Sequence, residues 1–169
     1  MPQKYTEENG RYTIDCSEAA WSSNSFHEYS QKYTNSLLCD VDFVIEDTDC
    51  VLLVEYKNAK VRNAPEAKAF NPLGDDKLNN VARKFYDSSH ILNLMGRMKP
   101  RKYVYVIEYD KGDSTSRKAL RNRLKNRLPF RLQSNIGDGA NTMITDIDVV
   151  NIEEWNDKRE YSKFPIASV

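Results

Sequence analysis

The chain has 169 residues, and its 25 basic and 25 acidic residues give a formal net charge of zero at pH 7. Hydrophobic residues make up 40% and charged residues 30%, a balance typical of a folded soluble protein and not of a disordered one. No apolar run is long enough for a transmembrane helix or a signal peptide, and three cysteines, an odd number, argue against a disulfide framework. We therefore expect one domain over residues 1–169, in a reducing cytoplasmic environment and with no membrane partner.

The first elements expected along the chain are a short strand at residues 11–16 and a helix at residues 17–34. The run Ser22-Ser23-Asn24-Ser25 weakens the middle of this helix, because short polar side chains compete for backbone hydrogen bonds. If the helix is continuous, Glu18 lies near its start on the face that carries two tyrosines. Helical phasing puts Glu28 away from those tyrosines.

Two mostly apolar runs, residues 40–45 and 51–57, are separated by four polar turn formers at 46–49 and predict a β-hairpin. A two-residue turn at Asp47-Thr48 sets the expected register. Because side chains alternate across a strand, the pattern places Val41 on a face that is entirely apolar or aromatic.

The charged residues of this hairpin fall together on the other face. They are Asp40, Asp42, Glu55 and Lys57, and in the expected register Asp40 faces Glu55 while Asp42 lies diagonally beside it. Carboxylates this close repel one another, and removing them from water is unfavourable unless positive charge compensates. A divalent cation with Lys57 beside it is the simplest compensation. The alternative is a half-exposed hairpin whose polar face meets solvent.

Asp42 precedes Glu55 by thirteen positions, and Glu55-Tyr56-Lys57 has the order acid, any residue, lysine. This pattern resembles the signature of the PD-(D/E)xK nucleases, the restriction-endonuclease-like enzymes that include Holliday junction resolvases. The resemblance covers residues 37–58 directly. The residue before Asp42 is Val41, where the name of the family has proline.

The resemblance implies metal-dependent hydrolysis of phosphodiester bonds, with Mg²⁺ as the cofactor and Mn²⁺ able to replace it. It assigns Asp42 and Glu55 as metal ligands, together with the backbone carbonyl of Tyr56. Lys57 would orient or deprotonate the attacking water and neutralise developing charge. Asp40, on the same face, is a further candidate for a metal-associated acid.

The same resemblance points to candidates outside the hairpin. Its resolvase-like branch places a metal-associated acid early in the first helix, so Glu18 is a candidate and Glu28 a competing one. For both, a surface glutamate near a helix N-terminus is the alternative. Several branches add a lysine, glutamine or tyrosine from the helix that follows the hairpin, and here Lys84 is the candidate.

The elements expected after the hairpin alternate between helix and strand. They are a loop at 59–74, a helix at 75–96, a strand at 102–109, a helix at 117–128, a strand at 143–150 and a short helix opened by a capping box of Asn151 and Glu154. The tail from Lys158 onwards is polar and is expected to be mobile.

The segment 117–128 contains six basic residues and no acidic one, and its leucines recur at helical spacing. If Arg117, Arg121 and Lys125 lie along one side of this helix, they would neutralise nucleic-acid phosphates. The alternative is a helix face that only meets solvent. The next candidates for substrate contact, in the loop at 59–74, are Lys60, Arg62 and Lys68.

The order of helix, hairpin, helix, strand, helix and strand predicts an α/β sandwich with a mixed central sheet flanked by helices. The resemblance narrows this to a restriction-endonuclease-like fold. The predicted function is that of a metal-dependent nuclease, a DNA endonuclease in a phage, defence or DNA-processing role. Its partner would be nucleic acid, with DNA favoured over RNA, and the resemblance also implies a homodimer. The alternative is a protein that keeps the fold without catalysis and binds nucleic acid or a protein partner.

Overall fold

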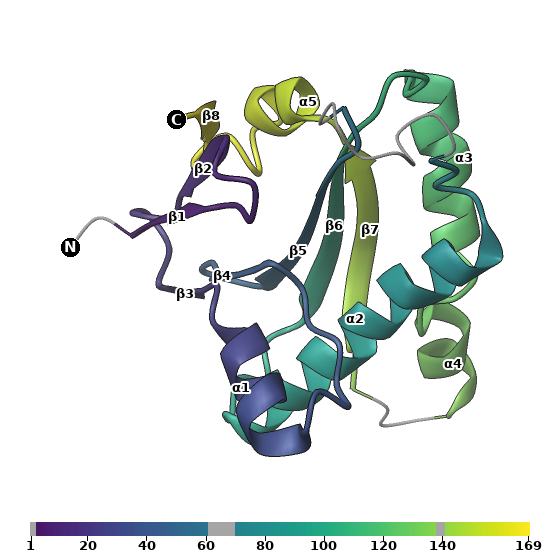
Figure 1. The fold of residues 1–169 in the computed structure, drawn as a ribbon. Helices are drawn as coiled ribbons and strands as arrows, with labels where there is room; N and C mark the ends of the chain where they lie inside the picture. The colour runs from purple at the N-terminus through teal and green to yellow at the C-terminus, as the bar shows by residue number, and fades with distance from the viewer. Residues whose placement is uncertain (1–2, 61–69, 138–140) are drawn as a thin grey trace.

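A central sheet of five strands organises the protein, in a computed structural model that describes residues 3–60, 70–137 and 141–169 (Figure 1). The strands are β3 (Trp21–Ser23), β4 (Phe43–Glu46), β5 (Val51–Asn58), β6 (Arg101–Glu108) and β7 (Ile144–Val150). Their order in the sheet follows their order in the chain. The strands β3, β4 and β5 are antiparallel neighbours, whereas β5, β6 and β7 run parallel, so the sheet is mixed.

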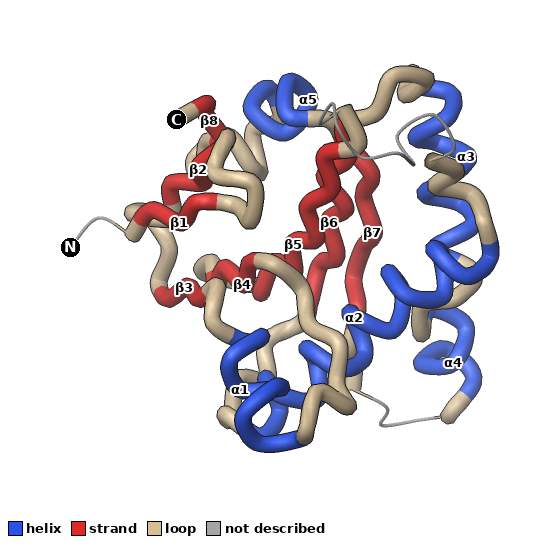
Figure 2. The backbone as a smooth tube through the Cα atoms, viewed as in Figure 1, coloured by secondary structure: helices blue, strands red, loops and turns tan. Residues whose placement is uncertain are grey.

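Helices cover one face of the central sheet, and a second sheet with one short helix covers the other (Figure 2). The helices are α1 (Phe26–Thr34), α2 (Asp75–Leu94), α3 (Ser114–Lys125), α4 (Phe130–Asn135) and α5 (Ile152–Asp157). The second sheet has the order β1 (Lys4–Thr6), β2 (Tyr12–Asp15) and β8 (Ile166–Ser168) and is antiparallel. The apolar residues of α2 and α3 pack against one face, and those of α5 and the second sheet pack against the opposite face.

The two central strands β5 and β6 supply side chains to both cores. Leu53 and Tyr103 point towards α2 and α3, whereas Leu52 and Val104 point towards α5 and the second sheet. A strand buried on both faces reads as a continuous apolar run, as both of these do. A charged side chain in such a strand is unfavourable unless an opposite charge or hydrogen bonds compensate it. The charged residues of β5 therefore mark a place where such compensation is expected.

The prediction of a mixed α/β protein with a mixed central sheet is confirmed. The short helix after β7 opens with the expected capping box, because Asn151 accepts a hydrogen bond from the Glu154 N–H at 2.8 Å and Glu154 accepts one from the Asn151 N–H. The second sheet was not expected, since it joins strands from the two ends of the chain.

The predicted helix over residues 17–34 is wrong in its first half. Strand β3 occupies Trp21–Ser23 and pairs with β4, and helix α1 begins only at Phe26. The serine-rich run favours this outcome, because serine is a weak helix former and the hydrogen bonds of a neighbouring strand were available. Glu18 therefore lies exposed in a turn before β3 and not on a helix.

The predicted mobile tail after Lys158 is also wrong. Tyr161, Phe164 and Ile166 are buried there, and β8 completes the second sheet. Tyr161 stacks on Trp155 with ring centroids 4.6 Å apart, and the Trp155 indole N–H donates to the Phe164 carbonyl at 2.7 Å. Three large apolar side chains among polar neighbours were the signal for this packing.

Candidate active site

The hairpin of β4 and β5 has a different register from the one expected. Val44 pairs with Leu53, and the turn lies at Thr48-Asp49, because the Asp47 N–H donates to the Cys50 carbonyl at 2.9 Å. The expected register is wrong by two residues, and an even shift keeps the side chains of the paired residues on their predicted faces. Phe43 pairs with Val54, so extending the same register by one residue places Asp42 directly opposite Glu55.

Asp42 and Glu55 meet at the end of the hairpin that lies away from the turn. One Asp42 carboxylate oxygen accepts a hydrogen bond from the Tyr56 N–H at 2.7 Å, which holds the side chain across the start of β4. In a strand the N–H and C=O of one residue point to the same neighbour, so the Tyr56 carbonyl also lies on the Asp42 side of β5. The two carboxylates and this carbonyl are the three oxygen donors that the sequence predicted.

Burial dominates the electrostatics of this pair. Glu55 is 7% exposed, and desolvation, with the Asp42 charge as the next cause, raises the pKa of Glu55 to about 8. Desolvation also raises the pKa of Asp42, although Lys84 and the Tyr56 N–H act in the opposite direction. Burial therefore disfavours the charged form of both carboxyl groups.

Lys84, on α2, is the cation that compensates Glu55. Its ammonium donates to both carboxylate oxygens of Glu55, at 2.7 and 2.9 Å. Desolvation lowers the pKa of Lys84, but the charges of Glu55 and Asp42 outweigh it, so the pKa of Lys84 is raised. Lys84 lies beside Val81 and Phe85, on the buried stripe of α2, and a lysine within an apolar stripe was its sequence signal.

Lys57 lies near the end of β5, on the same face as Glu55, and is exposed. Within the described part of the chain its ammonium forms no ion pair or side-chain hydrogen bond. The structure therefore separates the two lysines near the acids. Lys84 is fixed as the partner of Glu55, whereas Lys57 is available at the edge of the site.

Asp40 lies before β4 and not on a strand as the alternation pattern predicted, and it contacts α1. It accepts a hydrogen bond from the Ser30 hydroxyl at 3.0 Å and lies 3.3 Å from the imidazole Nδ1 of His27, both on α1. Strand geometry begins only at Phe43, and Val41 packs in the helix-side core instead of on the face predicted for it. Asp40 nevertheless lines the same pocket as Asp42, and its role as a metal-associated acid stays a prediction.

Segment 39–41 is tied to α2 by two hydrogen bonds. The Cys39 N–H donates to the Asp87 carboxylate at 2.8 Å, and the buried Val41 N–H donates to the Ser88 hydroxyl at 3.0 Å. One helix therefore carries the lysine that binds Glu55 and the residues that hold the chain just before Asp42. This arrangement fixes both carboxylates relative to α2.

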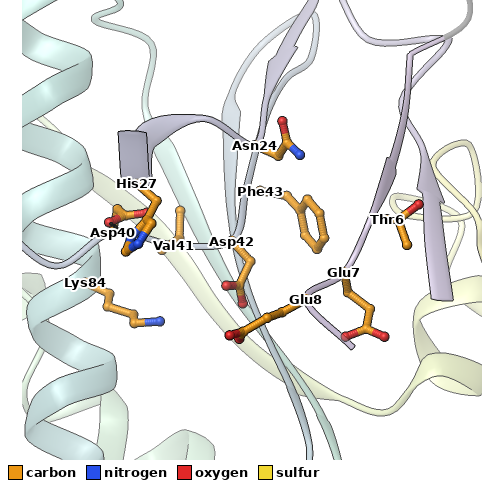
Figure 3. A pocket seen from close by; sticks show the side chains of 10 residues that line it. All are labelled: Thr6, Glu7, Glu8, Asn24, His27, Asp40, Val41, Asp42, Phe43 and Lys84. Atoms are coloured by element: carbon orange, nitrogen blue, oxygen red, sulfur yellow. Dashed lines mark hydrogen bonds and ion pairs between the residues drawn. The ribbon is translucent and has the colours of Figure 1, made fainter. Parts of the chain in front are cut away.

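A pocket of about 370 Å³ opens beside these residues (Figure 3). Its wall includes Asp42 from the hairpin, Lys84 from α2, His27 from α1, and Glu8 from the turn between β1 and β2. Figure 3 shows the Asp42 and Glu8 carboxylates and the Lys84 ammonium turned towards the same space. Sequence reasoning missed Glu8 and His27, because only the packing of distant segments brings them here.

The candidate acids outside the hairpin do not reach this pocket. Glu18 lies exposed before β3, and Glu28 lies exposed in the first turn of α1. Neither is among the residues that line the pocket. Glu8, from the turn between β1 and β2, lines the pocket instead.

The donor set fits a hard divalent cation. Asp42, Glu55 and the Tyr56 carbonyl offer only oxygen, the donor type that Mg²⁺ and Mn²⁺ prefer. Burial raises the pKa of both carboxyl groups, and a bound cation would favour their charged forms. Over residues 3–60, 70–137 and 141–169, no three histidine, cysteine, aspartate or glutamate side chains are grouped closely enough to hold an ion together. Two carboxylates and a backbone carbonyl are thus the ligands that this part of the chain offers.

The arginines predicted to contact phosphate hold α3 against the rest of the fold. Arg117 is buried and donates to both carboxylate oxygens of Glu154, at 2.6 and 2.8 Å. Arg121 donates to the Ile147 carbonyl at 2.7 Å and also pairs with Asp146. Only Lys125 of the three predicted residues is exposed. Phosphate binding by these residues stays a prediction, for which Arg117 and Arg121 would have to exchange their present partners.

The loop candidates for substrate contact are only partly visible. Lys60 forms an ion pair with Glu108 at 3.0 Å. Arg62 and Lys68 lie outside the described residues, so the structure says nothing about them.

Comparisons of the chain with models of protein families, with curated proteins and with solved structures found no match. Among its described helices, none is both long and apolar enough to span a bilayer. The chemistry of the pocket and its neighbouring charges is therefore the basis for inferring what the protein does.

We predict that Ser88→Ala destabilises the protein by about 1–3 kcal/mol, because the buried Val41 N–H would lose its acceptor. Ser89→Ala is the matched control, since the Ser89 hydroxyl is buried and has no hydrogen-bond partner within the described chain. The control should leave the free energy of unfolding unchanged or slightly higher. Urea unfolding of the three proteins measures this, and equal losses in both variants would contradict the proposed tie between α2 and the hairpin.

We also predict that Glu55 makes stability depend on pH. Because its pKa rises from 4.5 to about 8 on folding, its contribution is complete below about pH 4.5 and is lost as the pH rises through 8. The wild-type free energy of unfolding should therefore fall more steeply across this window than that of Glu55→Gln, by up to about 1.4 kcal/mol per pH unit. Asp42 titrates in both proteins, so the difference reports Glu55. If the free energies of unfolding of the wild type and Glu55→Gln change in parallel with pH, burial does not raise the pKa of Glu55.

Proposed function

We propose that the protein is a metal-dependent nuclease that hydrolyses phosphodiester bonds in DNA. The observation that carries this proposal is that Asp42 lies opposite Glu55 on the neighbouring strand and lines an open pocket. Lys57 follows Glu55 by two residues on the same strand. Two buried carboxylates that share one lysine suit a site that gains a divalent cation and a phosphate together.

Each residue has a role in this proposal. Asp42 and Glu55, with the Tyr56 carbonyl, would hold Mg²⁺ or Mn²⁺, which when bound activates water and neutralises charge on the phosphate. Lys57, exposed on the same strand face as Glu55, is placed to orient the attacking water or to stabilise charge that develops on the phosphate. Lys84 keeps the Glu55 carboxylate in position from α2.

The mixed sheet supports the proposal in a second way. Helix α1 is followed by the antiparallel hairpin of β4 and β5, then by helix α2, and then by β6, which runs parallel to β5. This is the order expected from the resemblance to PD-(D/E)xK nucleases. Asp42, just before β4, and Glu55, on β5, are the acids that this resemblance assigns to the site. The narrower assignment to a restriction-endonuclease-like fold belongs to this proposal.

We predict cleavage of DNA by the purified protein with Mg²⁺ or Mn²⁺ and none with EDTA. Asp42→Asn and Lys57→Ala should each lower the rate by at least about a hundredfold, because each removes a group that acts on the reacting phosphate or water. Glu18→Gln, a change in an exposed acid outside the pocket, should cleave like the wild type, whereas the two inactive variants control for contaminating nuclease. Linear, circular and branched DNA and RNA should be compared. Absence of metal-dependent cleavage on all of them by folded protein would refute the proposal.

A second candidate is a binding protein without catalysis, and one observation favours it. The Lys84 ammonium already contacts both oxygens of Glu55, so the buried acid has a counter-charge without any metal. In this candidate the acids and lysine are structural, and nucleic acid or a protein partner binds elsewhere on the surface.

Calorimetry with Mn²⁺ separates the two candidates. For a nuclease we expect Mn²⁺ to bind the wild type, and binding to be lost in Asp42→Asn, because a neutral amide is a poor ligand for a hard cation. Glu18→Gln is the matched control, since Glu18 is exposed and does not line the pocket, and it should leave Mn²⁺ binding within a fewfold of the wild type. No heat of Mn²⁺ binding to the wild type, together with metal-independent DNA binding, would favour the binding protein.

A further inference from the structure

An apolar groove lies between α1 and the C-terminal end of α2 (Figure 1). Its volume is about 290 Å³, at the lower end of the ~300–1,000 Å³ typical of pockets for small molecules. Tyr29 and Tyr33 form its α1 side, and Leu94 and Met95 lie on the side formed by the end of α2. All four side chains are exposed, and a contiguous group of exposed apolar side chains marks a surface that another molecule covers.

The two tyrosines offer flat rings to a molecule that enters the groove. Tyr33 is 69% exposed, and Tyr29 stacks against it with ring centroids 6.5 Å apart and planes inclined by 21°. Both rings are therefore held in place before a ligand arrives. Every nucleobase has a flat face that stacks on an exposed aromatic ring, and apolar side chains can cover its other face. The shape and size of the groove thus suit one base.

The groove shares a wall with the pocket that contains Asp42. Ser30 lines the groove, and its hydroxyl donates at 3.0 Å to Asp40, which lines the pocket. On α1, His27 lines the pocket and Tyr33 lines the groove, about 9 Å apart along the helix axis. Figure 3 shows His27 and Asp40 next to each other on one side of the pocket. A strand with a phosphate in the pocket therefore has the groove within reach of its neighbouring nucleotides.

The charges at the groove are compatible with a nucleic-acid strand. Among the residues that the structure describes, no carboxylate lines the groove. Lys32 does not line the groove, but its ammonium lies 5.2 Å from the centroid of the Tyr33 ring. An exposed lysine beside a stacking ring can turn to a phosphate of the strand whose base is stacked there.

We propose that the groove binds an unpaired base of a nucleic-acid strand whose scissile phosphate lies in the pocket. The inference rests on the proposed nuclease function for the phosphate, and it goes further by naming the substrate class. In a duplex the bases are paired and stacked on one another, so a base enters the groove only after it has been unstacked. A single-stranded or branched substrate has this base free and is therefore favoured over continuous duplex DNA.

The experiment is fluorescence anisotropy of labelled DNA in EDTA, where metal-dependent cleavage does not occur. The probes are a single strand, the duplex of the same sequence, and a strand of the same length with abasic sites, which keeps the phosphates and loses bases. We expect the single strand to bind the wild type at least about tenfold more tightly than either of the other probes, because each stacked base adds affinity.

Variants of the groove locate the binding site. Tyr33→Ser should weaken binding of the single strand by about tenfold and leave duplex binding unchanged, because it removes the more exposed ring. Tyr33→Phe keeps the ring and should bind within a fewfold of the wild type. Leu132→Ser, a change in a side chain 59% exposed on α4 and outside the groove, is the matched control and should bind like the wild type. Circular dichroism and thermal unfolding confirm that the variants are folded.

The remaining outcomes overturn the proposal. They are a wild type that binds none of the probes, equal affinity for single strand and duplex, and equal affinity for the intact and abasic strands. If Tyr33→Ser leaves DNA binding unchanged and lowers the mass measured by light scattering, protein covers the groove and a base does not. Because binding is measured without metal, a preference for the single strand in a protein that never cleaves would count against the nuclease alone. Cleavage without that preference would count against the groove alone.

Discussion

The structure around the pocket depends on one constraint, the burial of Glu55 beside Asp42 within a sheet that is covered on both faces. Two carboxylates in this position repel each other and lose hydration, which is why their pKa values rise. A sequence gains no stability from such a pair. A cluster that opposes folding is more readily understood as part of a functional site than as part of a core.

Three residues of helix α2 stabilise the buried pair and the backbone next to it. Lys84 supplies the positive charge, and Asp87 and Ser88 hold the backbone of residues 39–41. These three residues lie within little more than one turn of the helix, so a movement of α2 would change the charge balance and the position of Asp42 together. The helix is in turn held by its apolar stripe, from Leu78 to Leu92, against the sheet. The precision of the site therefore comes from packing at some distance from the pocket.

Sequence reasoning succeeded where local pattern decides the outcome. The hairpin, α2, β6 and the capping box at Asn151 follow from periodicity and turn chemistry, and the shared face of Asp42 and Glu55 survived a register error because that error was even. It failed where distant segments decide, as at β3, whose serines are ordered by pairing with β4. For the same reason no pattern in the sequence could show that Glu8 reaches the pocket or that Asp40 turns towards His27.

The ion pairs of α3 show how the arginines of a basic segment can serve the fold in a chain of zero net charge. Three arginines of α3 each form an ion pair with a carboxylate of another element, and these ion pairs join α3 to α5, β7 and α2. They are Arg117, Arg121 and Arg123. Attraction of a polyanion would then have to come from the pocket itself, whose wall is acidic. A carboxylate has about four lone-pair positions, so Glu55 can keep Lys84 and still accept a cation. A divalent ion bound to Asp42 and Glu55 would make the local charge positive and would attract a phosphate into the pocket.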